Sequence, residues 1–487
     1  MLFNSIKYLI FLIVTVSLYF IIPKKYRWIV LLVGSYAFYI IYDWRFIFLL
    51  VGVTFVTYGG ALLIDKFKDR LALKRLFLIL TLVLCFGALI FFKYLGFLNE
   101  ILNKIITSFD PANPTWSLSI ILPIGISFYI FQTTSYVIDV YRGEEAEKHI
   151  GYYALFASFF CTLLAGPISR RKDLLPQLKA EHAAKDVDFA EASRYLLLGC
   201  FKKVAVADII GIFVASTYAH LGEVNGFVIL LATILFAFQI YCDFSGYSDM
   251  AVGSAKLFGI NLVENFKEPY KATTIKEFWN RWHLSLSTWF RDYIYFPLGG
   301  SRVNKVKWAF NIMVVFLVSG LWHGANLTFL VWGALHGLFQ IIGRLTLPLR
   351  NKLLEKMKLD TNGAFVRSLR TIGVFLLVDF CWIFFVANSI GDAGLAISKI
   401  FTDWSGNTMS QLISMGATRF FLVYSIIAVT VCLMIENIKY IKTSPNIVFS
   451  KEWARIVVYS ILLLAVIGTW IYLQSSSVES SFIYFEF

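Results

Sequence analysis

The sequence predicts an all-α polytopic membrane protein, and three observations support this fold class. Hydrophobic residues make up 58% of the 487-residue chain and charged residues only 15%, and the mean hydropathy is +0.70. The chain also contains 47 Phe and 25 Tyr, an aromatic content that is not typical of a soluble domain with so few charges. Finally, apolar runs long enough to cross a hydrocarbon core of roughly 30 Å follow one another along almost the whole chain.

Twelve apolar runs are expected to be transmembrane helices, eleven in a membrane core and one extra helix near the C-terminus. In chain order they are residues 4–22, 26–42, 46–64, 76–94, 118–138, 195–218, 226–250, 307–320, 327–343, 371–388, 418–436 and 455–473. The two runs within 307–343 are short and interrupted by Gly, so we expect tilted or partial crossings there.

Two further segments are too polar to span a membrane and too apolar to be ordinary loops. Residues 150–169 cover about half a crossing before Gly166-Pro167 interrupts the helix. Residues 275–298 are amphipathic and rich in aromatic side chains. We expect both to be re-entrant or interfacial helices that enter from the cytoplasmic side.

The formal net charge of +13 comes from basic residues that stand between the apolar runs. This arrangement is typical of cytoplasmic loops that face anionic membrane lipids, and it disfavours nucleic acid as a partner. With twelve crossings the basic clusters all fall on one side of the membrane, at residues 24–27, 66–75, 170–172, 202–203 and 344–358. Both termini are then expected outside the cell.

The six cysteines lie in or beside apolar runs, and no two of them form a Cys-x-x-Cys pair. We interpret them as small residues of the membrane core, neither disulfide-bonded nor bound to metal. No trio of His, Cys and carboxylate residues has the spacing of a metal site, so none is expected. The first apolar run lacks a small-residue cleavage site, so a cleaved signal peptide is not expected either.

The stretch from Phe278 to Phe339 carries polar residues that a lipid-facing segment would avoid. His323 is the main candidate, because a neutral imidazole in a desolvated site is a competent general base; a packing histidine is the alternative. Asn326 is expected on the same helical face, where it could orient the ring or a substrate carbonyl. In a continuous helix His336 would lie roughly 220° further round the axis, and we expect it to be a packing residue.

A second polar group is found in RWHLSLSTWFRD, residues 281–292, where His283 lies between Arg281 and Arg291, and Arg302 follows. Arginine suits phosphate because its guanidinium is forked and permanently charged. An acyl-CoA or a phosphopantetheine carrier is therefore one candidate ligand. A basic cluster at the level of the lipid headgroups is the alternative.

Two more features need an explanation. Asp243, in QIYCDFSGYSD, must be paired or functional at membrane depth. The chain ends in FIYFEF, residues 482–487, after a Ser-rich spacer, and such a hexapeptide is unfavourable when exposed to water. It is either an interfacial aromatic anchor or a tail that folds back and docks in a groove of this protein or of a partner.

Taken together, these blocks resemble the membrane-bound O-acyltransferase (MBOAT) family, in the bacterial branch that contains alginate O-acetylases and the D-alanyl transfer proteins of teichoic acid. The resemblance rests on FWNRWHLSLSTWFRDYIYFPLGGSR and SGLWHGANLTFLVWGALHG. Further support comes from LPIGISFYIFQTTSYVIDVYRG, LLAGPISR, FKKVAVAD and QIYCDFSGYSDMAVG. It extends to about residue 440.

The resemblance implies an acyl transfer in which the donor is a cytoplasmic thioester, acetyl-CoA or an acyl carrier, with no permanently bound cofactor. The family's essential Trp-His-Gly histidine falls on His323, and a second family histidine falls on His283. The tyrosine of the C-terminal acyl-transfer motif falls on Tyr484, which implies that Tyr484 holds the acyl group as an ester. Residues that could line the donor site or tunnel are Arg281, Arg291, Arg302, Asn326 and Asp243.

The resemblance also implies three regions: a membrane core at 1–440, a basic inner loop with an extra transmembrane helix at 441–473, and an extracellular tail at 474–487. The acceptor would be an envelope polysaccharide or exopolysaccharide, reached through an extracellular SGNH-type partner protein at the bacterial plasma membrane. Because the motif is fused to the core here, acetyl is favoured over D-alanyl, which is the alternative. A proton-coupled transporter is an alternative from another class, but we find no internal repeat, and a transporter gives the tail no role.

Overall fold

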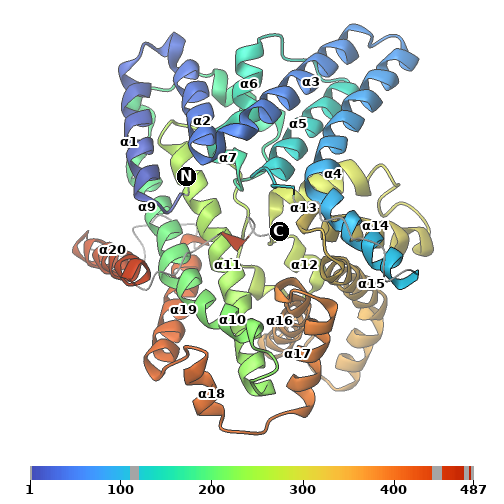
Figure 1. The fold of residues 1–487 in the computed structure, drawn as a ribbon, viewed down its shortest axis with the longest axis vertical. Helices are drawn as coiled ribbons and strands as arrows, with labels where there is room; N and C mark the ends of the chain where they lie inside the picture. Colours follow the sequence, from blue (N-terminus) through green and yellow to red (C-terminus); the bar gives the residue numbers. More distant parts are fainter. Residues whose placement is uncertain (1–2, 110–119, 441–451, 476–481, 484–487) are drawn as a thin grey trace. The chain divides into compact units, whose positions relative to one another are not determined.

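The computed structural model describes residues 3–109, 120–440, 452–475 and 482–483 (Figure 1). Within these ranges every regular element is helical, and no strand occurs among them. Seven helices of the described chain are long and apolar enough to cross a membrane, and the bent pair Thr408–Ser414 and Arg419–Ile435 would make an eighth. The all-α polytopic fold class is thus confirmed, whereas the count of twelve crossings stays a prediction.

The chain divides into two compact units, residues 1–196 with 248–264 and residues 197–247 with 265–487. The first unit contains, in order, α1 (Ile6–Ile21), α2 (Arg27–Asp43), α3 (Ile47–Lys66), α4 (Leu71–Phe109), α5 (Ile126–Tyr141), α6 (Ile150–Ser158), α7 (Phe160–Leu163), α8 (Arg171–Lys179) and most of α9 (Phe189–Cys200). Its helices α3, α4 and α5 pack on one another, and α2 packs on α1 and α6. The division expected at residue 440 is not tested by these units.

The second unit carries all the described candidate residues. It contains the π-helix η4 (Phe201–Ala207), α10 (Asp208–Ala219), most of α11 (Gly226–Lys256), α12 (Ile275–Trp279), α13 (Leu284–Phe290), the π-helix η6 (Arg291–Tyr295), α14 (Lys305–His323), α15 (Leu327–Lys356), α16 (Ala364–Val386), α17 (Ile390–Thr402), α18 (Thr408–Ser414), α19 (Arg419–Tyr440) and α20 (Glu452–Ser475). The expected interfacial segment 275–298 is therefore not one helix but three short helical pieces.

The core of the second unit is a close pair of helices, α14 and α15, which lie side by side (Figure 1). Glycine permits this approach, because a Cβ on Gly320 would stand 2.3 Å from the carbonyl oxygen of Phe329. In the same way, a Cβ on Gly333 would stand 2.3 Å from the carbonyl oxygen of Phe316. Close backbone contact of this kind is the usual role of small residues between membrane helices.

The extra C-terminal helix α20 packs on the π-helix η4. Leu473 near the end of α20 is buried against Val204 and Ile209. The Tyr424 hydroxyl on α19 donates to the carbonyl oxygen of Ala205 at 2.8 Å, so it supplies a donor where the π-helix departs from the regular α-helical ladder. Helices α19 and α20 thus meet at a short π-helical segment, a type of element often found at functional sites.

Candidate active site

His323 is the last residue of α14 and is only 3% exposed. The helix ends there because Gly324 is extended, with φ −165° and ψ 156°. A Cβ on Gly324 would stand 2.1 Å from the ring of Phe329, so a larger residue there would force that ring to move. The imidazole of His323 meets two aromatic rings edge-on, Trp332 at 4.9 Å and Phe385 at 5.4 Å between centroids.

The expectation for Asn326 is wrong, because α14 does not continue past His323. Asn326 is instead the N-cap of α15, where its side-chain oxygen accepts from the Thr328 N–H at 3.0 Å. Its side-chain amide donates to the carbonyl oxygen of Asn388 at 2.9 Å. The Asn326 side chain therefore fixes the start of a helix and is not on a shared face with His323.

The same helix break changes the relation of His336 to His323. The two histidines do not face different sides of one helix, since both lie 4.9 Å from the ring of Trp332. The His336 Nδ1 accepts from the Trp279 indole N–H at 3.3 Å, and the rings of Phe278 and Phe316 are nearly parallel to the imidazole at 6.2 and 6.1 Å between centroids. These contacts agree with the packing role expected for His336.

These rings belong to what we call the aromatic cluster, which consists of Trp332 and five rings that contact it directly. Its members are Trp279, His323, Trp332, His336, Trp382 and Phe385, and Trp332, His336 and Trp382 are completely buried. The indole N–H groups of Trp332 and Trp382 find no acceptor among the described residues. Buried donors of this kind are suited to a substrate carbonyl or to a water molecule.

His283 is also fully buried, and its backbone lies in the left-handed region at φ 44° and ψ 57°. A non-glycine residue held there is uncommon and is found preferentially at functional sites. Its ring contacts Phe244 at 4.6 Å and Trp322 at 5.8 Å, and Trp322 in turn contacts His323 at 5.0 Å. Burial lowers the pKa of His283 to about 3, so the imidazole is neutral at physiological pH.

A large cavity opens beside the aromatic cluster, with a volume of about 1660 Å³. Trp279 and Phe316 belong to its lining, and so does Ser319, one helical turn before His323. Its charged lining is entirely basic among the described residues, namely Lys276, Arg291, Arg344, Arg350 and Arg370. Such a cavity favours an anionic ligand.

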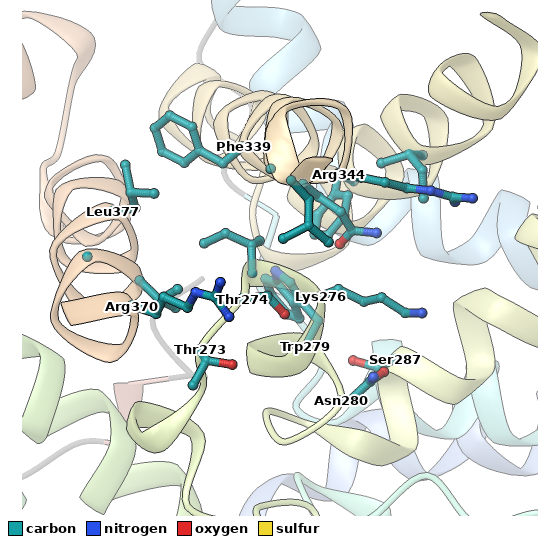
Figure 2. Close-up of a pocket in the computed structure, with 18 of the residues that line it drawn as sticks. Thr273, Thr274, Lys276, Trp279, Asn280, Ser287, Phe339, Arg344, Arg370 and Leu377 are labelled. Atoms are coloured by element: carbon teal, nitrogen blue, oxygen red, sulfur yellow. The ribbon is translucent and has the colours of Figure 1, made fainter. Parts of the chain in front are cut away.

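Figure 2 shows how the cavity is divided between apolar and polar walls. Phe339 and Leu377 lie on the side formed by α15 and α16, and Asn280 and Ser287 lie on the opposite side. Arg370 extends from α16 toward the segment that contains Thr274. The Arg344 guanidinium lies over the Trp308 ring at 4.4 Å, which holds this charge at the wall of the cavity.

The three arginines predicted to bind phosphate are not gathered at one place. Arg291 lines the cavity, although it also pairs with Asp292 at 2.9 Å. Arg281 is outside the lining and is held by Glu277 at 2.8 Å, and Arg302 is exposed, also outside the lining. Burial raises the pKa of Glu277, but hydrogen bonds from Thr273 and the Arg281 charge outweigh this and lower it, so Arg281 keeps an ionised partner.

Asp243 is paired, as its depth requires. Its Oδ1 lies 2.6 Å from the Nζ of Lys203, and that nitrogen also lies 2.7 Å from Oδ1 of Asp208. We call these three residues the charge triad. Lys202 and Lys203 are only 4% and 2% exposed, so the expectation that they belong to a basic inner loop is wrong.

The C-terminal tail reaches this triad. The Ile483 N–H donates to Oδ2 of Asp243 at 2.9 Å, and the Phe482 ring stacks on Tyr247 at 4.5 Å. Phe482 and Ile483 are buried, so of the two alternatives for the tail these residues follow the second, docking in a groove of the protein itself. Tyr484 lies outside the described residues.

Sequence reasoning missed several residues of the site because they converge from distant parts of the chain. Trp382 and Arg370 come from α16, where no local pattern distinguishes them. Lys203 had a usable signal: it stands five residues before Asp208 in FKKVAVAD, the spacing of a π-helical turn. Arg344 and Arg350 were counted as loop charges, whereas α15 continues through both of them.

The chain is similar to known proteins along most of its length. Residues 146–375 match the membrane-bound O-acyltransferase family. A probable alginate O-acetylase of Azotobacter vinelandii is 38% identical, over 88% of this chain and 84% of that protein. Another from Pseudomonas putida is 34% identical over the full length of both chains.

A third relative differs in acceptor. It is a peptidoglycan O-acetyltransferase of Helicobacter pylori, 31% identical over 94% of this chain and 91% of that protein. These three relatives match 88%, 100% and 94% of this chain. Together with its apolar helices, they show that the chain belongs to the membrane-bound O-acyltransferase family, as a multi-pass membrane enzyme that transfers acyl groups to oxygen.

Proposed function

We propose that the protein moves an acetyl group from a cytoplasmic thioester, acetyl-CoA or an acyl carrier, to Tyr484, and from there to an extracellular partner that O-acetylates a polysaccharide. One observation carries this proposal: Phe244 contacts both His283 at 4.6 Å and the tail residue Phe482 at 6.0 Å. The tail is therefore docked one ring away from a candidate histidine. Tyr484 follows Ile483 directly, and consecutive Cα atoms are only about 3.8 Å apart.

The basic cavity supports a thioester donor. Acetyl-CoA and phosphopantetheine carriers both bear phosphate, which arginine and lysine bind well. The apolar wall with Phe339 and Leu377 suits a pantetheine arm. Ser319 and Trp279 lie where the cavity approaches the aromatic cluster, so an extended donor would bring its thioester toward His323.

The chemistry assigned to His323 is general-base catalysis. Its neutral imidazole takes the phenolic proton of Tyr484 while the phenol oxygen attacks the thioester carbonyl. The C–S bond then breaks, the thiolate receives the proton from the imidazolium, and Tyr484 is left as an acetyl ester. The indole N–H groups of Trp332 and Trp382 are the available donors for the developing carbonyl oxyanion.

A phenol ester is more reactive than an alkyl ester, so the acetyl group can pass on to a hydroxyl of an SGNH-type partner and then to the polysaccharide. Acetyl is favoured over D-alanyl, because the relatives that match nearly the whole chain are named as O-acetyl-transferring proteins. Membership of an acyltransferase family disfavours the transporter alternative. The proposal places the protein in a bacterial plasma membrane with both termini outside.

The Tyr484→Phe variant tests the proposal, because it removes the hydroxyl and keeps the ring. We expect complete loss of polymer acetylation, with normal protein abundance. Mass spectrometry of the C-terminal peptide from the unaltered protein should show an acetyl adduct, and the variant should show none. Full activity in the variant, with no adduct in the unaltered protein, would exclude Tyr484 as carrier.

A further inference from the structure

We propose that Asp243, held by Lys203, is the docking acceptor that sets the position of the C-terminal tail and so presents the residue after Ile483 to the active site. Asp243 is a positioning residue in this scheme. The inference rests on the proposed role of Tyr484 for its purpose, but the docking itself is independent of any chemistry at Tyr484.

The two oxygens of the Asp243 carboxylate have separate partners. Oδ1 faces the Lys203 ammonium at 2.6 Å, and Oδ2 accepts the backbone N–H of Ile483 at 2.9 Å. A hydrogen bond to an ionised, buried acceptor is stronger than one between neutral groups. Because the donor is a backbone N–H, the bond fixes which residue of the tail sits at Asp243 through the register of the chain.

An aromatic contact fixes the neighbouring residue. Phe482 is 1% exposed and lies between two residues of α11, stacked on Tyr247 at 4.5 Å and edge-on to Phe244 at 6.0 Å. Tyr247 stands one helical turn after Asp243, so the ring and the backbone N–H of the tail bind along one face of α11. Two adjacent tail residues thus have two defined contacts.

The π-helix η4 connects this docking site to the extra helix. Lys203 in η4 reaches Asp243, while the adjacent Val204 packs against Leu473 of α20. From Ser475 at the end of α20 to Phe482 is seven residues, which span up to roughly 25 Å when extended. Helix α20, which carries the tail, and Asp243, which accepts it, therefore both contact the π-helix η4.

Glycine allows α11 to approach that support closely. A Cβ on Gly246 would stand 2.7 Å from the carbonyl oxygen of Gly199 and 3.0 Å from the backbone nitrogen of Lys203. Gly246 is three residues after Asp243, on the same helical face. The short Lys203–Asp243 distance thus depends on a small residue at this contact.

The charges of the triad also favour a hydrogen-bond donor beside Asp243. Two carboxylates lie beside the Lys203 ammonium, and the N–H of Ile483 adds a positive dipole beside one of them. One such hydrogen bond and one stacked ring form a hold that is specific but reversible. A carrier that must deliver its acyl group to a partner needs this reversibility.

Photo-crosslinking tests the docking directly. Replacement Phe482→p-benzoylphenylalanine, in the full chain in membranes, should give after irradiation a crosslink to α11 near Phe244 and Tyr247, identified by peptide mass spectrometry. In the Asp243→Asn background the single amide oxygen turns to Lys203, so the tail loses its acceptor. We expect the crosslinked fraction to fall about tenfold or more.

Asp208→Asn is the matched control, because it removes the other carboxylate from Lys203 and does not touch Ile483. The crosslinked fraction should stay within twofold of the unaltered protein in this variant. Gel filtration in detergent identifies variants that fail to fold, and for those Lys203→Met provides a second test, with the same expected fall. An equal fall in Asp243→Asn and Asp208→Asn, no fall in Asp243→Asn, or no crosslink to α11 at all, would each overturn the proposal.

Docking and carrier chemistry can fail separately. Adding Tyr484→Phe to the photo-crosslinking protein should leave the crosslink unchanged. A crosslink without any acetyl adduct on Tyr484 would keep the docking site and remove the proposed carrier. An acetyl adduct on Tyr484 without the crosslink would keep the proposed carrier and remove the docking site.

Discussion

The basic cavity and the aromatic cluster meet at Trp279 but have opposite compositions. The cavity gathers five basic side chains in about 1660 Å³, whereas the cluster consists of aromatic rings with no Lys, Arg, Asp or Glu among its members, and in it His323 is 3% exposed and His336 fully buried. The first region can recognise a charged ligand, and the second excludes water. Under the proposed function, donor recognition would belong to the cavity and acyl transfer to the aromatic cluster.

This separation has a physical reason. Charged donors such as CoA need strong, long-range attraction, which a field of guanidinium groups provides. Thioester transfer needs a dry site in which an imidazole accepts a proton and water does not compete. A guanidinium placed within the cluster would disfavour protonation of His323, so the two requirements conflict within one site.

The largest expected effect is in the cluster. His323→Ala should lower the rate of acyl transfer by a factor on the order of 10²–10⁴, as expected for loss of a general base, with little change in donor affinity. Labelled acetyl-CoA and membranes from expressing cells would provide the assay, with protein abundance checked by immunoblot. Near-normal transfer by an abundant variant would place the chemistry elsewhere.

The next effect concerns the helix contact that supports the cluster. Gly320→Ala would place a Cβ 2.3 Å from the Phe329 carbonyl oxygen, so α14 and α15 must separate. We expect a loss of about 1–3 kcal/mol in stability and a fall in activity as His323 shifts.

Gly468→Ala in α20 is the control, since nothing lies within 4 Å of its added Cβ. It should be neutral or stabilising by up to about 1 kcal/mol. Thermal unfolding in detergent measures both variants. Equal stability of Gly320→Ala and Gly468→Ala would contradict the close-packed helix pair.

The cavity should respond differently from the cluster. Arg344→Gln and Arg370→Gln should each raise the KM for the donor several-fold, by about 1 kcal/mol per lost charge contact, and leave kcat almost unchanged. Lys352→Gln is a suitable control, because Lys352 is exposed on the same helix as Arg344 and is outside the cavity lining. Effects confined to kcat would mean that the two regions are not separate in function.

The two regions also differ in how well the sequence predicted them. Hydropathy located the helices well, because a span in lipid must be continuous and apolar: expected runs 226–250 and 455–473 correspond to α11 and α20. The sequence singled out His323 and His283 because polar groups in apolar surroundings are conspicuous, and both side chains are buried; their catalytic roles stay predictions. Asn326 was misplaced because α14 ends at His323 and Gly324 is extended, whereas the expectation assumed a continuous helix.

Most of the cavity was missed for a related reason. Its lining combines α12, α14, α15 and α16, so no local spacing could place Arg370 and Thr274 in the same cavity wall. Lys203 was assigned to a loop because a lysine pair beside an apolar run usually lies at a membrane surface. Its burial becomes understandable with its two counter-charges, Asp208 five residues later and Asp243 forty residues later in the sequence.

The smallest effect, and the most specific, concerns the acid sensitivity of His283. Burial lowers its pKa to about 3, against roughly 6.5 in an unfolded chain. Below pH 6.5 the unfolded chain therefore binds a proton that the folded protein does not bind. The free energy of unfolding should fall by about 1.4 kcal/mol for each pH unit between 6.5 and 3, and this contribution should be constant above pH 6.5.

His283→Asn separates this effect from the backbone conformation, because Asn tolerates the left-handed region better than most residues. Between pH 7 and pH 5 the variant should lose about 2 kcal/mol less stability than the unaltered protein. His220→Asn is the control, since His220 is exposed, and it should keep the full acid sensitivity. Thermal unfolding in detergent at the two pH values provides the measurement. If His283→Asn were as acid-sensitive as His220→Asn, His283 would have to take up a proton in the folded protein. Its ring would then have to be accessible to water.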